Sequence, residues 1–291
     1  MDPKKQFNIL QNDKQDQPIS RKKVLQKLGD AGKNFLTASL LSGTFIGFSP
    51  KKSAAQFEDL EIVRSLNLIT QIEMMQELFY VNGIINADFL TGSLRTIIKE
   101  IQQNQKQHIV ILKNVIATYQ LRETIRLKFD FTAEGQFAPY SNLDDFLAIA
   151  QIMEDFAVGA YKTFIKKIFQ QNPDDNVKQF LFRLASTESR HAYMIRNLRA
   201  QNGFSDLKGW INDTDSNTIP SSLTRLYQNE DNTTQQDIDV PSITEVPVQS
   251  VREAWDEPLD RIAVDEVFDL FNKSFNYFGA NASTHNSESL T

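Results

Sequence analysis

"ASTESRHAYMIR", residues 185–196, places Glu188 and His191 three positions apart in a segment with helical periodicity. Three residues along an α-helix correspond to about 60° around its axis and ~4.5 Å along it, so the two side chains point in the same direction. The rest of this face is apolar, with Leu184 and Ile195. A buried carboxylate or imidazole without a partner is unfavourable. Glu188 and His191 must therefore bind a ligand, pair with each other or contact water.

The sequence around this stretch contains four long segments with helical spacing of apolar residues. They are Leu60–Asn82, Ser93–Tyr119, a third from Asn142 to about Gln170, and a fourth from Asn172 to Gly203. The first two and the last two segments have short connections, whereas about twenty residues separate the second from the third. This order predicts an all-α, up-down four-helix bundle with a long central crossover.

The last two segments have recognisable ends. Asn142 is a suitable N-cap, with Asp145 at the third helical position. For the fourth segment we predict Asn172 as the cap and Pro173 at the first helical position, with the helix stopping at Gly203.

Polar residues interrupt the apolar stripes of all four segments. They are Glu73 in the first, Gln105 and His108 in the second, Glu154 in the third, and Glu188 and His191 in the fourth. The spacing repeats, because 108 − 73 is 35 and 191 − 154 is 37. The first helix pair thus supplies a Glu followed by Gln-x-x-His, and the second pair supplies a Glu followed by Glu-x-x-His.

This doubled pattern predicts a metal site in the bundle core. Carboxylate oxygens and imidazole nitrogens suit divalent iron or manganese, and carboxylates can bridge two ions. Two of the three histidines occupy equivalent places in the pattern. Gln105 departs from it, because a fourth carboxylate is expected there; with three carboxylates a second ion should bind more weakly. The alternative is that these residues are exposed, or form His–Glu pairs without a metal.

With these motifs, the chain resembles the ferritin-like domain family of exported bacterial proteins and desiccation-related proteins. The resemblance rests on "LNLITQIEMMQELFY" (66–80), "QKQHIVIL" (105–112), "FLAIAQIMEDFAVGAY" (146–161) and "ASTESRHAYMIR", with further likeness in "LYQNEDNTTQQDID" (226–239) and "EAWDEPLDRIAVDEVFDLF" (253–271). It implies a ferritin-like bundle whose metal positions are Glu73, His108, Glu154, Glu188 and His191. At Gln105 the match fails.

The composition excludes several classes of function. A net charge of −6 and a pI of about 5.2 argue against nucleic-acid binding, since no basic face dominates. The chain has no cysteine, so disulfides, thiolate metal sites and thiol nucleophiles are excluded. We expect neither a nucleotide nor a haem cofactor. The sequence does not indicate an oligomeric state.

The first 55 residues have the features of an export signal. Ser20–Leu25 resembles the twin-arginine motif with Lys22 at the second arginine, an apolar run follows from Phe35 to Phe48, and small residues end at Ala55. We therefore expect a periplasmic or cell-envelope protein whose mature chain begins near Gln56 and has no membrane span. The alternative for this segment is a basic amphipathic helix on the protein surface.

The remaining domain boundaries follow from composition. We assign residues 56–205 to the bundle and 206–291 to a polar C-terminal extension. The extension should contain a helix over 258–275, with an apolar side made of Leu259, Ile262, Ala263, Val267 and Leu270, and should end in a disordered tail.

Three functions fit this sequence. The first is an exported protein that binds one or two iron or manganese ions and reacts with oxygen or peroxide, with Tyr80, Tyr161 and Tyr193 near the site either as redox groups or as core aromatics. The second is a metal-free bundle that serves as a structural, binding or stress-protective module, which Gln105 favours. Iron storage in a shell is the third, and the long extension argues against it.

Overall fold

The computed structural model describes residues 56–119, 127–212 and 215–273. The predicted export segment, residues 1–55, and the predicted disordered tail lie outside these described residues. Within the described ranges, none of the helices combines the length and the apolar composition that a membrane crossing requires.

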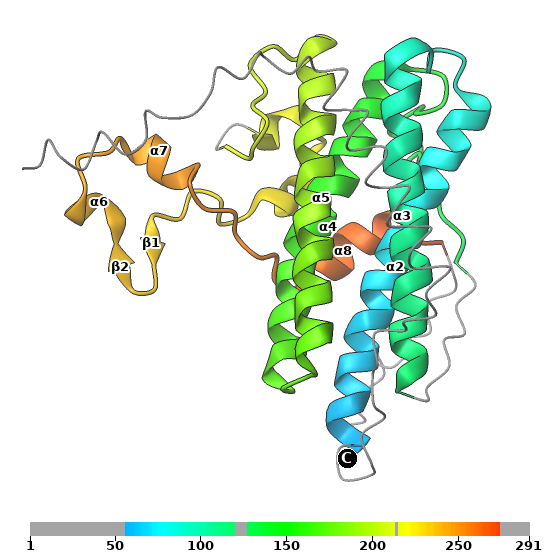
Figure 1. Cartoon of the computed structure of the whole chain (residues 1–291). Helices are drawn as coiled ribbons and strands as arrows, with labels where there is room; N and C mark the ends of the chain where they lie inside the picture. Colours follow the sequence, from blue (N-terminus) through cyan, green and yellow to red (C-terminus); the bar gives the residue numbers. More distant parts are fainter. Residues whose placement is uncertain (1–55, 120–126, 213–214, 274–291) are drawn as a thin grey trace, which may run out of the picture. The chain divides into compact units, whose positions relative to one another are not determined.

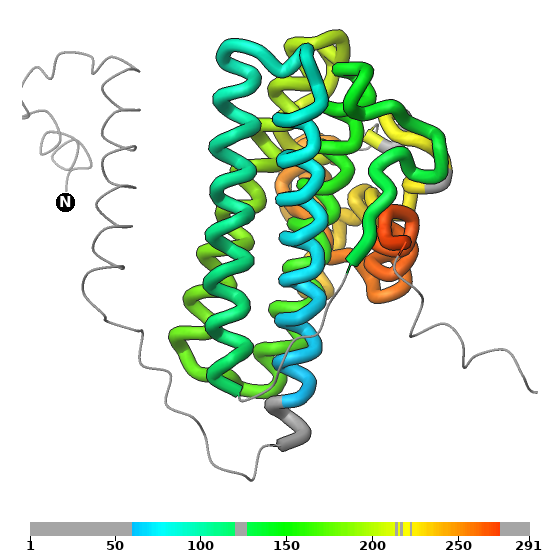
Figure 2. The backbone as a smooth tube through the Cα atoms, turned by 90° about the vertical axis from the view of Figure 1, so that its right-hand side faces the viewer, coloured from blue at the N-terminus to red at the C-terminus, as the bar shows by residue number. Residues whose placement is uncertain are grey.

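Four long helices form the bundle, as the sequence predicts (Figure 1). They are α2 (Gln56–Asn86), α3 (Gly92–Thr118), α4 (Leu143–Gln170) and α5 (Asp175–Gln201). Helix α2 packs along α3 and α4 packs along α5, and α2 also packs against α4. Figure 2 shows α2 and α3 side by side along their length. The all-α, ferritin-like four-helix arrangement with a long central crossover is confirmed.

The start of α4 is as predicted, and the start of α5 is not. The Asn142 side chain accepts hydrogen bonds from the backbone N–H groups of Asp144 and Asp145. Before α5, however, the cap is Asp174, whose side chain accepts from the N–H of Asn176. Asn172 has a positive φ of 46° and closes the last turn of α4. Asn adopts this left-handed conformation more readily than most residues, which is why it ends one helix rather than starting the next.

The crossover between α3 and α4 pairs with the chain that follows the last helix, α8 (Arg261–Phe271). Phe129 and Asn272 form an antiparallel bridge, and the N–H of Asp130 donates to the carbonyl of Phe271 at 2.8 Å. Asp260 caps α8 by accepting from the N–H of Ala263 at 2.7 Å. The predicted helix over 258–275 was therefore too long at both ends, because a cap and a bridge limit it.

The buried side of α8 also differs from the prediction. Ala263 and Val267 are buried as expected, but Ile262 is 59% exposed, and Phe268 and Phe271 are buried instead. The error arose from including Leu259 in the helical periodicity. Leu259 lies before the cap residue, Asp260, and packs against Gly159 of α4.

Helix α4 is buried on nearly every side. All residues from Phe146 to Tyr161 are buried, because α2 and α5 cover part of the helix and the extension covers the rest. Gly159 allows the closest approach: a Cβ at this position would lie 2.7 Å from Cγ of Leu259. The extension is therefore packed directly on the helix that provides Glu154.

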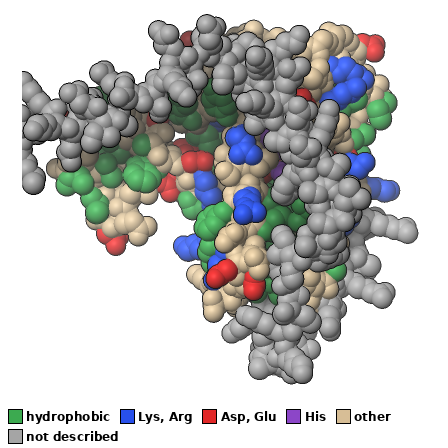
Figure 3. All heavy atoms as spheres, in the orientation of Figure 1, with side chains coloured by type: hydrophobic (Ala, Val, Ile, Leu, Met, Phe, Trp, Pro, Cys, Tyr) green, Lys and Arg blue, Asp and Glu red, His purple; other side chains and the backbone are tan. Residues whose placement is uncertain are grey.

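The extension consists of short elements beside the bundle. They are η3 (Asp215–Thr218), η4 (Ser221–Tyr227), β1 (Thr234–Gln235), β2 (Ile238–Asp239), α6 (Val240–Ile243) and α7 (Val248–Arg252). The two strands are antiparallel, with Thr234 opposite Asp239 and Gln235 opposite Ile238. Figure 1 shows the hairpin, α6 and α7 beyond α5, and Figure 3 shows exposed hydrophobic side chains in this part.

Candidate metal centre

The predicted ligand residues converge in the middle of the bundle. They form two groups, Glu73, His108 and Glu188, and Glu154, Glu188 and His191, and within each group one ligand atom per residue lies within 4.8 Å of the others. The three carboxylates are completely buried, and the two histidines are 8% and 5% exposed. Because Glu188 belongs to both groups, its carboxylate is placed as a bridge.

The first group is the tighter of the two. Nδ1 of His108 lies 3.1 Å from Oε2 of Glu73 and 3.0 Å from Oε1 of Glu188. In the second group, Nδ1 of His191 lies 3.8 Å from Oε2 of Glu154 and 3.5 Å from Oε1 of Glu188. Both imidazoles therefore direct Nδ1 toward the carboxylates, and their ring centroids are 6.1 Å apart.

Two buried amides lie among the carboxylates of the centre, and one of them, Gln105, stands where the doubled pattern has a carboxylate. Nε2 of Gln105 donates to Oε2 of Glu188 at 3.1 Å. Nε2 of Gln76 donates to the same oxygen at 3.2 Å and to Oε2 of Glu154 at 3.0 Å. Gln105 thus lies inside the centre, as predicted from its position. Gln76 is not among the predicted residues, although its place three residues after Glu73 puts it on the same helix face.

Two tyrosines position the outer carboxylates. The hydroxyl of Tyr80 donates to Oε1 of Glu154 at 2.5 Å, and that of Tyr161 donates to Oε1 of Glu73. Both rings are completely buried. Tyr193, the third tyrosine near the stripes, is 51% exposed and does not belong to the centre.

Four polar atoms of the centre lack a hydrogen-bond partner among the described residues. Two are amide oxygens, Oε1 of Gln76 and Oε1 of Gln105. The other two, Oε1 of Glu188 and Nδ1 of His191, have only the ion-pair contacts described above. Buried polar atoms in folded proteins are rarely left unpaired, and each unpaired one is unfavourable. Three oxygens and one imidazole nitrogen form a donor set that suits a divalent transition metal. The residues present therefore fit a metal ion.

Burial and neighbouring charged groups shift the pKa values of two carboxyl groups and one imidazole in the centre. Burial, and then the charge of Glu188, raises the pKa of Glu73 and raises that of Glu154 well above its ordinary value. Burial alone would lower the pKa of His108, but the charge of Glu73 and the contact with Glu188 outweigh it and raise this pKa to about 10.

Glu188 is the group that stays ionised. Burial disfavours its charged form, but the neighbouring His191 and a contact with His108 outweigh burial and hold the pKa of Glu188 below its ordinary range. One carboxylate between two imidazoles is therefore the fixed negative charge of the centre. A metal ion would displace the protons held by its neighbours.

Asn104 contacts the centre from outside. Its Nδ2 lies 3.1 Å from Nε2 of His191, the ring nitrogen that faces away from the carboxylates. Metal-ligating histidines are usually oriented by a partner on this second nitrogen. The spacing of residues in the sequence did not indicate this contact.

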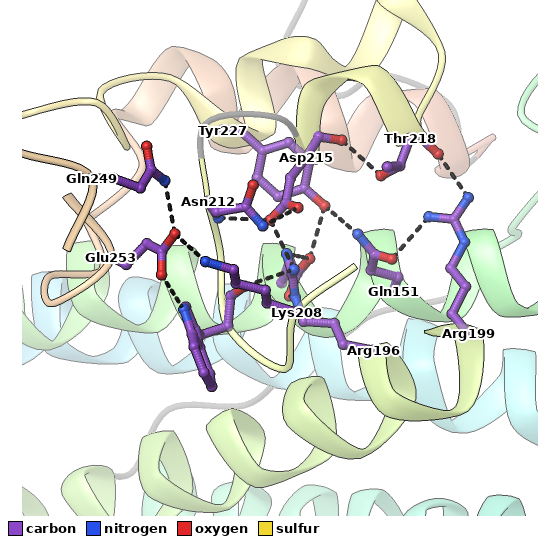
Figure 4. Close-up of polar contacts among 12 residues, drawn as sticks. Gln151, Arg196, Arg199, Lys208, Asn212, Asp215, Thr218, Tyr227, Gln249 and Glu253 are labelled. Carbon is purple, nitrogen blue, oxygen red and sulfur yellow. Dashed lines mark hydrogen bonds and ion pairs between the residues drawn. The ribbon is translucent and has the colours of Figure 1, made fainter. Parts of the chain in front are cut away.

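A second buried polar cluster joins the extension to the bundle (Figure 4). The Arg196 guanidinium, 1% exposed, donates to both oxygens of Asp155 at 2.9 and 2.6 Å and to Oδ2 of Asp215 at 2.8 Å. Tyr227 donates to Asp155 at 2.8 Å, and Gln151 donates to the hydroxyl of Tyr227 at 2.8 Å. Each group is paired, so the cluster fixes the extension on α4 and α5. No motif in the sequence indicated it.

The comparisons with known proteins agree with the geometry. Residues 61–201 match a family model described as "Ferritin-like domain". Neither a curated protein nor a solved structure matches the chain. The matched residues include α2 from Glu61 onward, the whole of α3, α4 and α5, and every residue of the centre.

Proposed function

We propose that the ferritin-like domain formed by residues 61–201 binds one or two iron or manganese ions in its core. The ferritin-like domain and its buried Glu and His groups could hold a metal. The main support for a bound ion is the convergence of the two buried groups on Glu188, next to two amide oxygens that accept no hydrogen bond, Oε1 of Gln76 and Oε1 of Gln105. Iron or manganese in this position would supply redox chemistry toward oxygen or peroxide.

The residues of the chain have distinct roles in this proposal. Glu188 would be shared by both ions, with Glu73 and His108 on one side and Glu154 and His191 on the other. The tyrosine hydroxyls would keep the outer carboxylates oriented, and the closely packed bundle would exclude bulk water. Because Gln105 leaves the centre with three carboxylates, a single ion should bind more tightly than a second.

The test is the metal content of the protein. The full chain is expressed with iron and manganese supplied together, purified without chelators, and analysed by inductively coupled plasma mass spectrometry. We expect bound metal in the natural protein and strong depletion in Glu188→Gln, since that change removes the only shared ligand. Glu100→Gln is the matched control, because Glu100 is exposed on α3. Absence of metal, or equal metal in both variants, would refute the proposal.

A second candidate is a metal-free bundle that acts as a structural or binding module of the cell envelope. The observation in its favour is that Gln76 and Gln105 both donate to Oε2 of Glu188. This carboxylate oxygen therefore has hydrogen-bond partners without an ion. Under this alternative, chelator treatment would leave the melting temperature of the purified protein unchanged. Metal binding to the folded state predicts a decrease.

We also propose that residues 1–55 direct export and that the mature chain begins near Gln56. The support is the order of basic, apolar and small residues in that segment. Mass spectrometry of the protein isolated from its native cells should give an amino terminus near Gln56. An intact first residue in the envelope fraction would contradict cleavage.

A further inference from the structure

A cleft of about 150 Å³ lies between α5 and the extension, on the outer side of the α4–α5 pair. Asp155, Ser189 and Ala192 are among the bundle residues that line it. Each directly follows a residue of the metal centre in the sequence, and so projects from a different side of its helix. The cleft is therefore separate from the metal centre.

Three aromatic side chains line this cleft and remain accessible. Tyr193, Trp210 and Trp255 are 51%, 52% and 45% exposed. The chain has only two tryptophans, and both are here. Aromatic rings combined with a few fixed polar groups are typical of small-ligand sites.

The aromatic walls are held in place by contacts within the protein. The Tyr193 ring packs directly on Gly209, where a Cβ would lie 2.5 Å from Cε2 of the tyrosine. Nε1 of Trp210 donates to Oε2 of Glu253 at 2.9 Å, and the carbonyl of Trp210 accepts from Arg196 at 3.2 Å. The cleft is thus formed before any ligand binds, which lowers the entropic cost of binding.

Every carboxylate that lines the cleft has a cation beside it. Of its three carboxylates, Asp155 pairs with Arg196 at 2.6 Å. The other two pair with lysines: Glu253 with Lys208 at 2.5 Å (Figure 4), and Asp256 with Lys162 at 2.6 Å.

A cationic ligand would have to displace one of these lysines, and an anionic ligand would have to displace one of the carboxylates; otherwise the charge of the ligand would stay uncompensated. This disfavours both a phosphate and an ammonium group. The paired carboxylates still have lone pairs that can accept hydrogen bonds from hydroxyl groups.

From these observations we propose that the cleft binds a neutral, polyhydroxylated ring, that is, a single unit of a sugar. The less polar face of the ring would stack on the aromatic side chains, and its hydroxyls would donate to the carboxylates at the rim. This proposal does not depend on whether the bundle binds a metal.

Intrinsic tryptophan fluorescence tests the proposal, because both tryptophans line the cleft. The full chain is titrated with glucose, N-acetylglucosamine and trehalose, and in parallel with choline chloride as an organic cation of similar size. We expect a saturable change in fluorescence with at least one sugar and none with choline. A saturable change with choline alone, or no saturable change with any sugar, would overturn the proposal.

Tyr193→Ala tests the location of the site and leaves both reporter tryptophans in place. Loss of one stacking face should weaken sugar binding about tenfold. Phe182→Ala is the matched control, since Phe182 is an exposed aromatic residue of the same helix, 57% exposed and outside the cleft.

Circular dichroism establishes that each variant is folded. If Tyr193→Ala is not, Trp255→Leu replaces it, with Trp210 remaining as the reporter and the same weakening expected. Unchanged affinity in a folded cleft variant, or equal weakening in the control, would refute the assignment.

Discussion

Replacing Gln105 by glutamate would restore the carboxylate that the doubled ligand pattern lacks. In the structure, Nε2 of Gln105 donates to Oε2 of Glu188 at 3.1 Å, and the residue is completely buried. The change therefore exchanges a hydrogen-bond donor for a second negative charge at the same place. Its effect should have opposite signs in the metal-free and the metal-loaded protein.

The metal-free effect can be worked out from the distance. Two unit charges 3.1 Å apart repel by about 5 kcal/mol at an effective dielectric constant of ~20. This corresponds to roughly four pKa units, so the new carboxyl should take up a proton at neutral pH instead of ionising. The remaining destabilisation is a few kcal/mol, which would lower the melting temperature of a chain of this size by roughly 5–10 °C.

With metal present, the added carboxylate is a ligand for a divalent cation in a dry interior. We expect Gln105→Glu to raise the metal content toward about two ions per chain, as in dinuclear carboxylate bundles, and to recover the lost melting temperature. The assay combines elemental analysis with thermal melts of metal-loaded and chelator-treated protein.

Gln102→Glu is the matched control for this experiment. Gln102 is on the same helix and donates to Glu77 at 2.8 Å, outside the centre, so its replacement also brings two carboxylates together. The control should melt lower with and without metal and bind no additional ion. If Gln105→Glu behaves in the same way, the dinuclear interpretation is wrong, and the metal-free module is the better description of this chain.

Three further predictions concern the metal-free protein and the extension. The pKa of His108 is raised from 6.5 to about 10, so protonated His108 stabilises the folded protein. This stabilisation is complete below pH ~6.5 and is lost as the pH rises toward ~10. The raised pKa of Glu73 acts in the same direction, and urea denaturation midpoints should therefore fall over this range; a constant midpoint would contradict the proton assignment. Tyr161→Phe removes the hydrogen bond to Glu73 and should destabilise the chelator-treated protein by about 1–3 kcal/mol; an unchanged urea midpoint would show that this hydrogen bond contributes little. Asp155→Asn leaves the buried Arg196 without its closest charge partner and should destabilise the extension by about 3–5 kcal/mol; limited proteolysis should then cleave within residues 206–257 faster than in the natural protein, and equal rates would refute this role for the cluster.

The sequence by itself determined the bundle and the positions of the ligand residues. Four long apolar repeats with one long crossover leave few alternatives to a four-helix bundle. A Glu and a His three positions apart must share a helix face, and the similar spacing in the two helix pairs, 35 and 37 residues, brings the two faces to nearly the same level. These are local rules of helix geometry, so the convergence of Glu73, His108, Glu154, Glu188 and His191 could be predicted without a structure.

Other features depend on contacts between segments that are far apart in the sequence. The start of α5 was misplaced because Asn172 and Asp174 are both plausible caps, and only the backbone conformation distinguishes them. The helix at the end of the extension was predicted too long because the bridge between Phe129 and Asn272 has no local signal.

Tertiary structure alone also decided which polar groups share a partner. Gln76 and Gln105 come from different helices, and only packing brings both amides to one oxygen of Glu188. Likewise, Arg196 and Asp155 are 41 positions apart, and an ordinary surface arginine cannot be distinguished from a buried one by its neighbours in the sequence. Helix periodicity specifies the direction of a side chain, but the partner that compensates a buried charge is specified only when the helices and the extension are packed together.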